Sequence, residues 1–120
     1  MKSKLKCKLI EEYIKIYRIA HLNIDNNLDK NLVDNLKIKS NQLLSVYETT
    51  FLRLGMLNSS FIHMKKELEI ATQTNHSVLS DENIFNDIIS TINTLSFEIA
   101  SKLTKLSINQ LEQNFILNRV

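Results

Sequence analysis

Residues 43–64 read LLSVYETTFLRLGMLNSSFIHM, and this stretch determines how many helices the chain forms because it contains Gly55, the only glycine. Apolar residues on both sides of Gly55 follow one heptad repeat, in which steps of four and three residues alternate. Ten of the thirteen repeat positions between residues 36 and 78 are apolar. The repeat positions are Leu36, Ser40, Leu43, Tyr47, Thr50, Leu54, Leu57, Phe61, Met64, Leu68, Ala71, Asn75 and Val78.

Two interpretations of Gly55 compete, and they differ in the number of helices. Because the repeat passes Gly55 without a change of phase, we predict one continuous helix over residues 28–75, roughly 70 Å long at about 1.5 Å per residue. A break would have no reason to preserve the phase. In the alternative, Gly55 lies just past the end of one helix, and Asn58 or Ser59 caps the next helix.

Further helices are predicted on both sides of this segment. The N-terminal helix covers residues 3–24 and ends where a run of Asn and Asp interrupts the apolar pattern, so that a new helix starts at Asn26 or Asn27. The C-terminal helix covers residues 81–118 and follows Ser80, a favourable N-cap residue. Its apolar stripe consists of Ile84, Ile88, Ile92, Leu95, Ile99, Leu103 and Leu106.

These patterns predict an all-α fold. We expect three antiparallel helices in an elongated helical hairpin, a three-helix bundle of the coiled-coil type, which forms a single domain over residues 1–120. The alternative is a compact four-helix bundle that is broken at Gly55. One glycine and no proline exclude β-sandwiches and barrels, which need frequent turn residues, and exclude glycine-rich phosphate-binding loops.

The charge balance does not by itself indicate a nucleic-acid or membrane partner. The chain carries 15 basic and 13 acidic residues, a net charge of +2, and only three of the basic residues are arginine. Only the N-terminal helix is electropositive, and this helix could dock an acidic protein partner, a nucleic acid or an anionic lipid. The cations concerned are Lys2, Lys4, Lys6, Lys8, Lys15 and Arg18.

Cysteine content and hydropathy indicate the compartment. Cys7 is the only cysteine and cannot form an internal disulfide, which suits a reducing environment. No apolar run reaches the roughly 18–20 residues that span a bilayer. We therefore expect a soluble intracellular protein of the cytoplasm or nucleus.

No arrangement of residues indicates catalysis or metal binding. His63 and Glu67 are spaced i and i+4, as metal ligands on a helix can be, but no third ligand occurs at a convincing spacing. Cys7 lies among lysines, yet a simple structural thiol is the better interpretation. We therefore predict a protein without enzymatic activity, catalytic residues, metal or cofactor.

The predicted function is that of a structural or adaptor subunit in a larger helical protein assembly, homo- or hetero-oligomeric. Between Ser40 and Met64 the only charged side chains are Glu48 and Arg53, whereas isolated coiled coils usually carry many exposed Glu and Lys. Such uncharged helix faces are typical of protein interfaces. The predicted contact residues are Leu43, Tyr47, Phe51, Leu54, Leu57 and Phe61, with Leu95, Ile99, Leu103 and Leu106 on the opposing wall.

Two other functions remain open from the sequence. The first is a self-contained four-helix bundle that binds one protein target, in the manner of an immunity protein or antitoxin. The second is a small DNA- or RNA-binding regulator, because residues 47–66 have the apolar spacing and turn glycine of a helix-turn-helix, and the N-terminal helix is basic. Nucleic acid is the less favoured partner, since no arginine occupies the positions that would face a groove.

Overall fold

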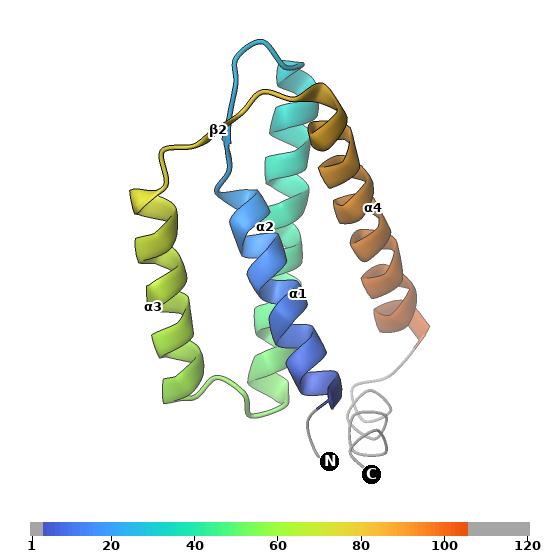
Figure 1. Ribbon diagram of the computed structural model, residues 1–120. Helices are drawn as coiled ribbons and strands as arrows, with labels where there is room; N and C mark the ends of the chain where they lie inside the picture. Colours follow the sequence, from blue (N-terminus) through green and yellow to red (C-terminus); the bar gives the residue numbers. More distant parts are fainter. Residues whose placement is uncertain (1–3, 106–120) are drawn as a thin grey trace.

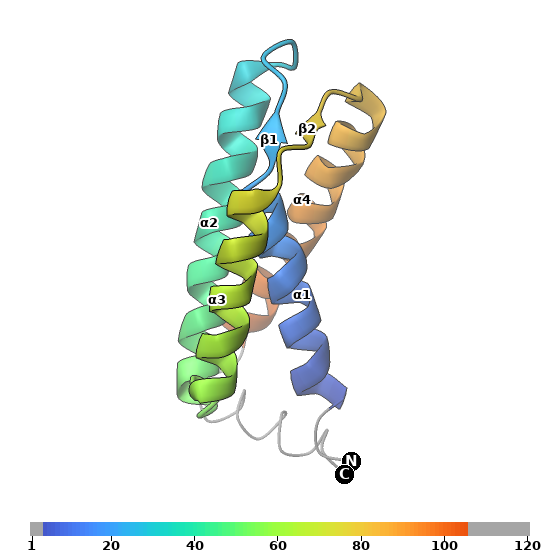
Figure 2. The ribbon, with the colours of Figure 1, turned by 60° about the vertical axis from the view of Figure 1, so that its left-hand side comes forward.

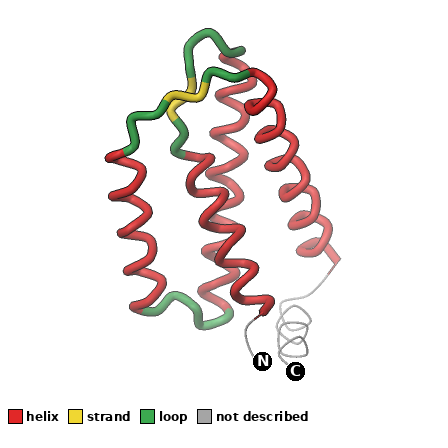
Figure 3. Tube along the Cα trace, in the orientation of Figure 1, coloured by secondary structure: helices red, strands yellow, loops and turns green. Residues whose placement is uncertain are grey.

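The chain forms four helices and one very short sheet within residues 4–105, the part that the computed structural model describes (Figure 1). Most of this part is helix, as Figure 3 shows. The elements in chain order are α1 (Lys4–Ala20), β1 (Asn23–Ile24), α2 (Lys30–Arg53), α3 (Ser59–Thr74), β2 (Val78–Leu79) and α4 (Glu82–Lys105).

Helices α1 and α2 form the antiparallel centre of the bundle, with α3 on one side and α4 on the other (Figures 1 and 2). Helix α1 packs mainly on α2 and also contacts α3, while α4 contacts α2. The all-α prediction is therefore confirmed. The elongated three-helix arrangement is not found, because the described chain folds as a compact bundle of four helices.

The prediction of one continuous helix over residues 28–75 is wrong, because the chain reverses at Gly55. Gly55 has a φ of +68°, a left-handed conformation that favours glycine. The N–H of Met56 donates to the carbonyl of Phe51 at 2.8 Å, and the N–H of Gly55 donates to that of Leu52 at 3.1 Å. These two bonds form a Schellman motif, which satisfies carbonyls at the end of α2 and stops the helix.

The unbroken heptad phase has a different cause from the one predicted. Both α2 and α3 bury one face against the same core, so apolar residues recur at helical spacing in each helix. Leu36, Leu43 and Tyr47 of α2 are buried, and so are Phe61 and Leu68 of α3. The molecule is 47 Å long, too short for the rod of roughly 70 Å expected from a helix of that length.

Side-chain caps set where three helices begin. As the four-helix alternative predicted, Asn58 caps α3 by accepting a hydrogen bond from the N–H of Phe61 at 3.1 Å. The starts of α2 and α4 are later than predicted. Asp29 caps α2 in place of Asn26 or Asn27, and Asp81 caps α4 in place of Ser80. A carboxylate at a helix N-terminus also interacts favourably with the helix dipole.

The two connections at one end of the bundle pair as parallel strands, a feature for which the sequence carries no signal. Asn23 lies opposite Val78, and Ile24 lies opposite Leu79. The N–H of Asp25 extends this pairing by donating to the carbonyl of Leu79 at 2.9 Å. The pairing fixes the α1–α2 connection against the α3–α4 connection.

Three aromatic rings from three helices meet at the centre of the core. The ring centroids of Tyr13 and Phe51 are 5.6 Å apart, those of Tyr13 and Phe61 are 5.4 Å apart, and those of Phe51 and Phe61 are 5.5 Å apart. All three pairs are tilted or edge-on, the geometry that aromatic quadrupoles favour. This aromatic cluster joins α1, α2 and α3.

Lys37 closes the C-terminal end of α1. Its Nζ donates to the carbonyl oxygens of Ala20 at 3.0 Å and Leu22 at 2.5 Å. Ala20 is the last residue of α1 and Leu22 follows it, so both carbonyls lie at the negative end of the helix dipole, where a cation is favourable. Partial burial lowers the pKa of the Lys37 ammonium from its ordinary value.

Replacing Gly55 by alanine should destabilise the protein by about 1–2 kcal/mol, because any residue with a Cβ is strained at this φ. Beyond the two neighbouring residues in the chain, no heavy atom lies within 4 Å of the added Cβ, so the cost comes from the local backbone conformation. Gly55→Asn should cost less, since asparagine tolerates the left-handed conformation better. Urea unfolding of the two variants measures both values. An alanine variant as stable as the wild type would instead favour a continuous helix.

The tyrosines should make the fold sensitive to alkali. Burial raises the pKa of Tyr13, with a further rise from the hydrogen bond to Glu48, and burial also raises the pKa of Tyr17 and Tyr47. A raised folded-state pKa stabilises the fold below the ordinary value of 10.0, and this stability is lost as the pH rises above it. Phenolate absorbance and helical circular dichroism should therefore change together. If the three tyrosines instead form phenolates near pH 10 while the protein keeps its full helicity, their side chains are not buried as described.

Candidate functional site

Most of the contact residues predicted on the heptad repeat lie in the chain's own core. Leu43, Tyr47, Phe51 and Phe61 are buried, and Phe51 is completely inaccessible. The polar repeat residue Ser40 is buried too, and its hydroxyl donates to the carbonyl of Leu36 at 2.7 Å. A partner could reach these side chains only if the helices separated.

The other predicted contact residues are divided between the core edge and the surface. Leu54 is half-buried, and Leu57 is exposed in the α2–α3 connection. On α4, Leu95 packs against the core. Ile99, Leu103 and Leu106 lie outside the residues whose side chains the structure describes.

The face of α2 that points away from α1 is uncharged along most of its length, and we name it the α2 outer face. Ile38, Ser45 and Leu52 recur on it every seven residues, with Gln42 and Thr49 between them, and all five are exposed. Ile38 is 55% exposed and Leu52 is 65% exposed. Large apolar side chains that share one exposed, uncharged face indicate an interaction surface better than scattered ones do.

This surface continues onto the start of α3. Glu48 of α2 pairs with Lys65 of α3 at 3.3 Å, so these two residues mark turns of the antiparallel helices that lie next to each other. Leu52 lies one turn beyond Glu48, and Ile62 lies one turn before Lys65, so both follow the same edge towards the connection. Ile62 is 55% exposed, and Leu57 in the connection is also exposed. We name Leu52, Leu57 and Ile62 the α2–α3 corner.

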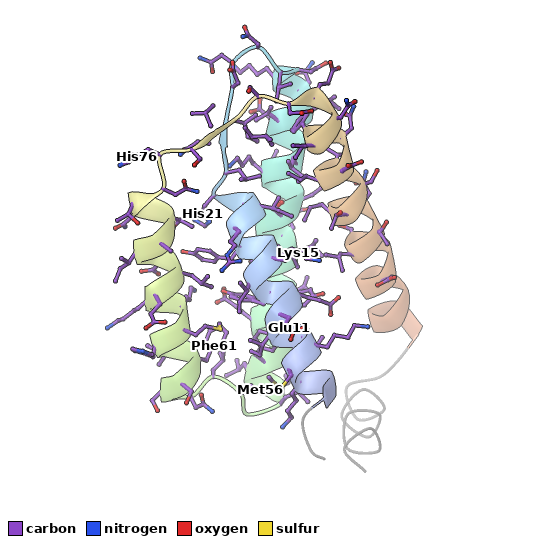
Figure 4. All side chains as sticks on the ribbon, in the orientation of Figure 1. Glu11, Lys15, His21, Met56, Phe61 and His76 are labelled. Carbon is purple, nitrogen blue, oxygen red and sulfur yellow. The ribbon has the colours of Figure 1, made fainter. Side chains whose placement is uncertain are left out.

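A second surface feature is an open groove between α1 and α4, with a volume of about 620 Å³. It lies on the other side of the bundle from the α2 outer face, and Figure 4 shows Glu11 and Lys15 on the part of α1 beside it. The lining residues are Glu11, Ile14, Lys15, Arg18, Ile19, Ile88 and Thr91. We name this feature the α1–α4 groove.

The structure separates the cations predicted to dock an acidic partner. Lys8, Lys15 and Arg18 are exposed on α1, and the last two line the α1–α4 groove. Lys6 is half-buried near the α2–α3 connection. Lys2, and the side chain of Lys4, lie outside what the structure describes.

Ionisable side chains form no recognisable reaction centre in the described part of the chain. His63 Nε2 and Glu67 Oε1 are 3.1 Å apart on the outside of α3, and both are largely exposed. Within residues 4–105, no three His, Cys, Asp or Glu side chains are close enough to hold a metal ion. Cys7 is exposed.

None of the helices in the described residues is both long and apolar enough to cross a lipid bilayer. Comparison with protein-family models, with curated protein sequences and with solved structures found no match to this chain. The interpretation of its surfaces therefore depends on their own geometry and chemistry.

Sequence reasoning missed the two surfaces for different reasons. The α2 outer face has a readable signal, because Ile38, Ser45 and Leu52 form a second heptad stripe opposite the first. The α1–α4 groove has none. Ile14 and Ile88 belong to ordinary apolar stripes, and only their tertiary placement makes them neighbours across a groove.

Glu48 lies one turn before the α2–α3 corner and contacts both neighbouring helices. Its Oε2 accepts a hydrogen bond from the buried Tyr13 hydroxyl at 2.7 Å, while Lys65 pairs with it from α3. Glu48→Ala should cost about 1–3 kcal/mol, because the Tyr13 hydroxyl is then buried without its acceptor. Loss of the ion pair with Lys65 should add little to this cost, because the pair is partly exposed to solvent.

A double-mutant cycle with Tyr13→Phe separates these contributions in urea unfolding. Once the hydroxyl is absent, Glu48→Ala should cost clearly less than in the wild type. Glu48→Gln is the matched control, since its amide oxygen can still accept the hydrogen bond. Equal costs of Glu48→Ala in both backgrounds would show that the hydrogen bond does not position the helices.

Proposed function

We propose that the chain is a non-enzymatic adaptor subunit of a larger helical protein assembly, and that it binds a partner through the α2 outer face and the α2–α3 corner. The observation that carries this proposal is the exposure of large apolar side chains on this surface: Leu52 is 65% exposed, and Ile38 and Ile62 are each 55% exposed. Transfer of these side chains from water to a partner would stabilise a complex.

The scarcity of charge on this surface also supports the proposal. Between Lys39 and Arg53, the only charged side chain of α2 is Glu48, which is paired with Lys65. The centres of protein interfaces are likewise poor in charged residues and are surrounded by a polar rim. Ser45 and Thr49 are small, so a partner helix could approach the α2 backbone closely between Ile38 and Leu52.

A second candidate is a self-contained bundle that binds one protein target, as immunity proteins and antitoxins do. It is favoured by the core, in which buried residues from all four helices form one cluster. Such a protein would be a stable monomer at high dilution, whereas an assembly subunit expressed alone should oligomerise. Analytical ultracentrifugation over a wide concentration range distinguishes the two candidates.

Nucleic-acid recognition by residues 47–66 gains no support from the geometry. The helices α2 and α3 lie side by side and antiparallel, whereas the helices of a helix-turn-helix cross at about 90–120° (Figures 1 and 2). Tyr47, Phe51 and Phe61 from this segment are buried in the core. Their side chains therefore do not reach a DNA groove.

The adaptor proposal predicts that the double variant Leu52→Glu/Ile62→Glu stays folded but loses its partners. Both side chains are exposed, so new charges there cost little in the free protein, yet they would be buried without a counter-ion in a complex. Quantitative mass spectrometry of proteins that co-purify from the native source should show at least about a tenfold loss of specific partners, since each 1.4 kcal/mol is tenfold.

The matched control is Ile70→Glu/Val78→Glu, because these two residues are as exposed and as apolar but lie off the proposed surface. This variant should retain the partners. If both double variants keep the same co-purifying proteins as the wild type, the α2 outer face is not the binding surface. If both lose them equally, the effect is not specific to that surface.

A further inference from the structure

The connection between α2 and α3 has the features of a hinge that can open. Residues 54–58 join the two helices, and the heptad repeat passes through them without a change of phase. If these residues became helical, the apolar faces of α2 and α3 would lie along one side of a single long helix. In the folded monomer the left-handed backbone of Gly55 prevents this.

Opening this hinge divides the chain into two parts that meet only through contacts a second copy can supply. Helices α3 and α4 lie on opposite sides of the α1–α2 pair and pack on it, and we name residues 59–105 the α3–α4 arm (Figures 1 and 2). The arm is held by the contact of Phe61 with Tyr13, by the β1–β2 pairing, and by the 2.8 Å hydrogen bond from Lys39 Nζ to Asn93 Oδ1. Two opened copies can make the same contacts with each other's arms.

The register of α2 against α3 in the monomer is close to the one that two extended copies would adopt. The ring centroids of Phe51 and Phe61 are 5.5 Å apart, and Met56 is the midpoint of these two residues along the chain. Glu48 and Lys65, which pair at 3.3 Å, are centred just after Met56. The antiparallel helices are therefore paired about the hinge itself, where the two-fold axis of an exchanged pair would pass.

The heptad repeat specifies almost the same centre. In two antiparallel continuous helices, knobs-into-holes packing would place Leu43 opposite Leu68 and Leu54 opposite Leu57, about a midpoint just before Met56. In the monomer Leu54 is only half-buried and Leu57 is 37% exposed. Exchange would bury both leucines of each copy beside the two-fold axis, which favours the pair.

We propose that two copies of this chain exchange their α3–α4 arms, and that α2 and α3 of each copy then form one continuous helix across Gly55. The contacts themselves select the occupant, because opening uncovers on the α1–α2 pair the surface that fits this arm. Gly55 sets the balance, since its left-handed conformation favours the closed monomer and its low helix propensity disfavours the continuous helix. The inference goes beyond the proposed function, because it concerns the chain's own assembly.

The test compares the full-length wild type with two variants at Gly55. Each protein is held at millimolar concentration near its thermal midpoint, cooled, and analysed by size-exclusion chromatography with light scattering. The wild type should yield a dimer that persists on dilution in the cold, because its separation requires partial unfolding. Gly55→Ala should raise the dimerisation constant by at least about a hundredfold, since it strains the closed form and improves both continuous helices. Gly55→Asn, which tolerates the left-handed conformation, should change it little.

An inserted residue separates arm exchange from any other dimer. One alanine placed after position 55 in the Gly55→Ala variant rotates the two halves of a continuous helix by about 100° relative to each other. The apolar faces of α2 and α3 then no longer align, so the exchanged dimer should be lost. The closed monomer should tolerate the insertion, because lengthening a surface connection costs little.

Hydrogen exchange reports the continuous helix directly. Ser59 and Ser60 are the first two residues of α3, so their N–H groups have no acceptor within that helix. In a continuous helix they would donate to the carbonyls of Gly55 and Met56. Exchange measured by NMR should therefore be fast at both serines in the monomer and slow in the dimer.

Leu57→Glu tests the leucines beside the two-fold axis. The exposed position should accept the charge in the monomer, as circular dichroism can check, whereas the dimer would bury it. In the Gly55→Ala background we expect at least about a tenfold loss of dimerisation. Leu52→Glu/Ile62→Glu is the matched control, since these side chains would lie outside the apolar seam of a continuous helix, and it should keep the dimer.

Four outcomes would overturn the inference. They are a wild type that stays monomeric after this treatment, a Gly55→Ala variant that dimerises no more than the wild type, a dimer that survives the inserted alanine, and a dimer in which Ser59 and Ser60 still exchange fast. A dimer that is lost in Leu52→Glu/Ile62→Glu and kept in Leu57→Glu would also reject arm exchange, because the two copies would then meet through their α2 outer faces.

Discussion

The ring contact between Phe51 and Phe61 depends on the chain reversing at Gly55. The left-handed backbone at Gly55 follows the end of α2 at Arg53 and allows α3 to return along α2, so both rings can pack on Tyr13 of α1. This aromatic cluster joins three helices at one point of the core. The exposed faces of α2 and α3 follow from it, because burying one side of each helix leaves the opposite side in solvent.

The resulting bundle has two surfaces of different chemistry on opposite sides. The α2 outer face with the α2–α3 corner is apolar and almost uncharged, which suits a contact that excludes water. The α1–α4 groove is lined by isoleucines together with Glu11, Lys15 and Arg18, so charges of both signs lie beside its apolar residues.

The prediction of the fold succeeded where local signals were sufficient. The helical class and the existence of a break after the first helix follow from periodicity and from residues that compete with helical hydrogen bonds. The helix nevertheless ends at Ala20 and not at the predicted residue 24, because Asn23 and Ile24 pair as a strand with β2. The number of helices was wrong, because heptad phase across Gly55 was taken as a sign of continuity. Phase cannot distinguish one long helix from two helices that face a common core. The Schellman bonds of Gly55 and the cap at Asn58 resolve this ambiguity.

The sequence by itself determined that the chain is helical and which stripe of each helix is apolar, because backbone hydrogen bonding and side-chain periodicity are local properties. Only the tertiary structure decided which neighbour covers each stripe. Tyr47 and Phe51 are covered by the chain's own helices, whereas Ile38 and Leu52 are not. Likewise, Ile14 and Ile88 line one groove because α1 and α4 both pack on α2, and contacts between residues so distant along the chain depend on three-dimensional packing.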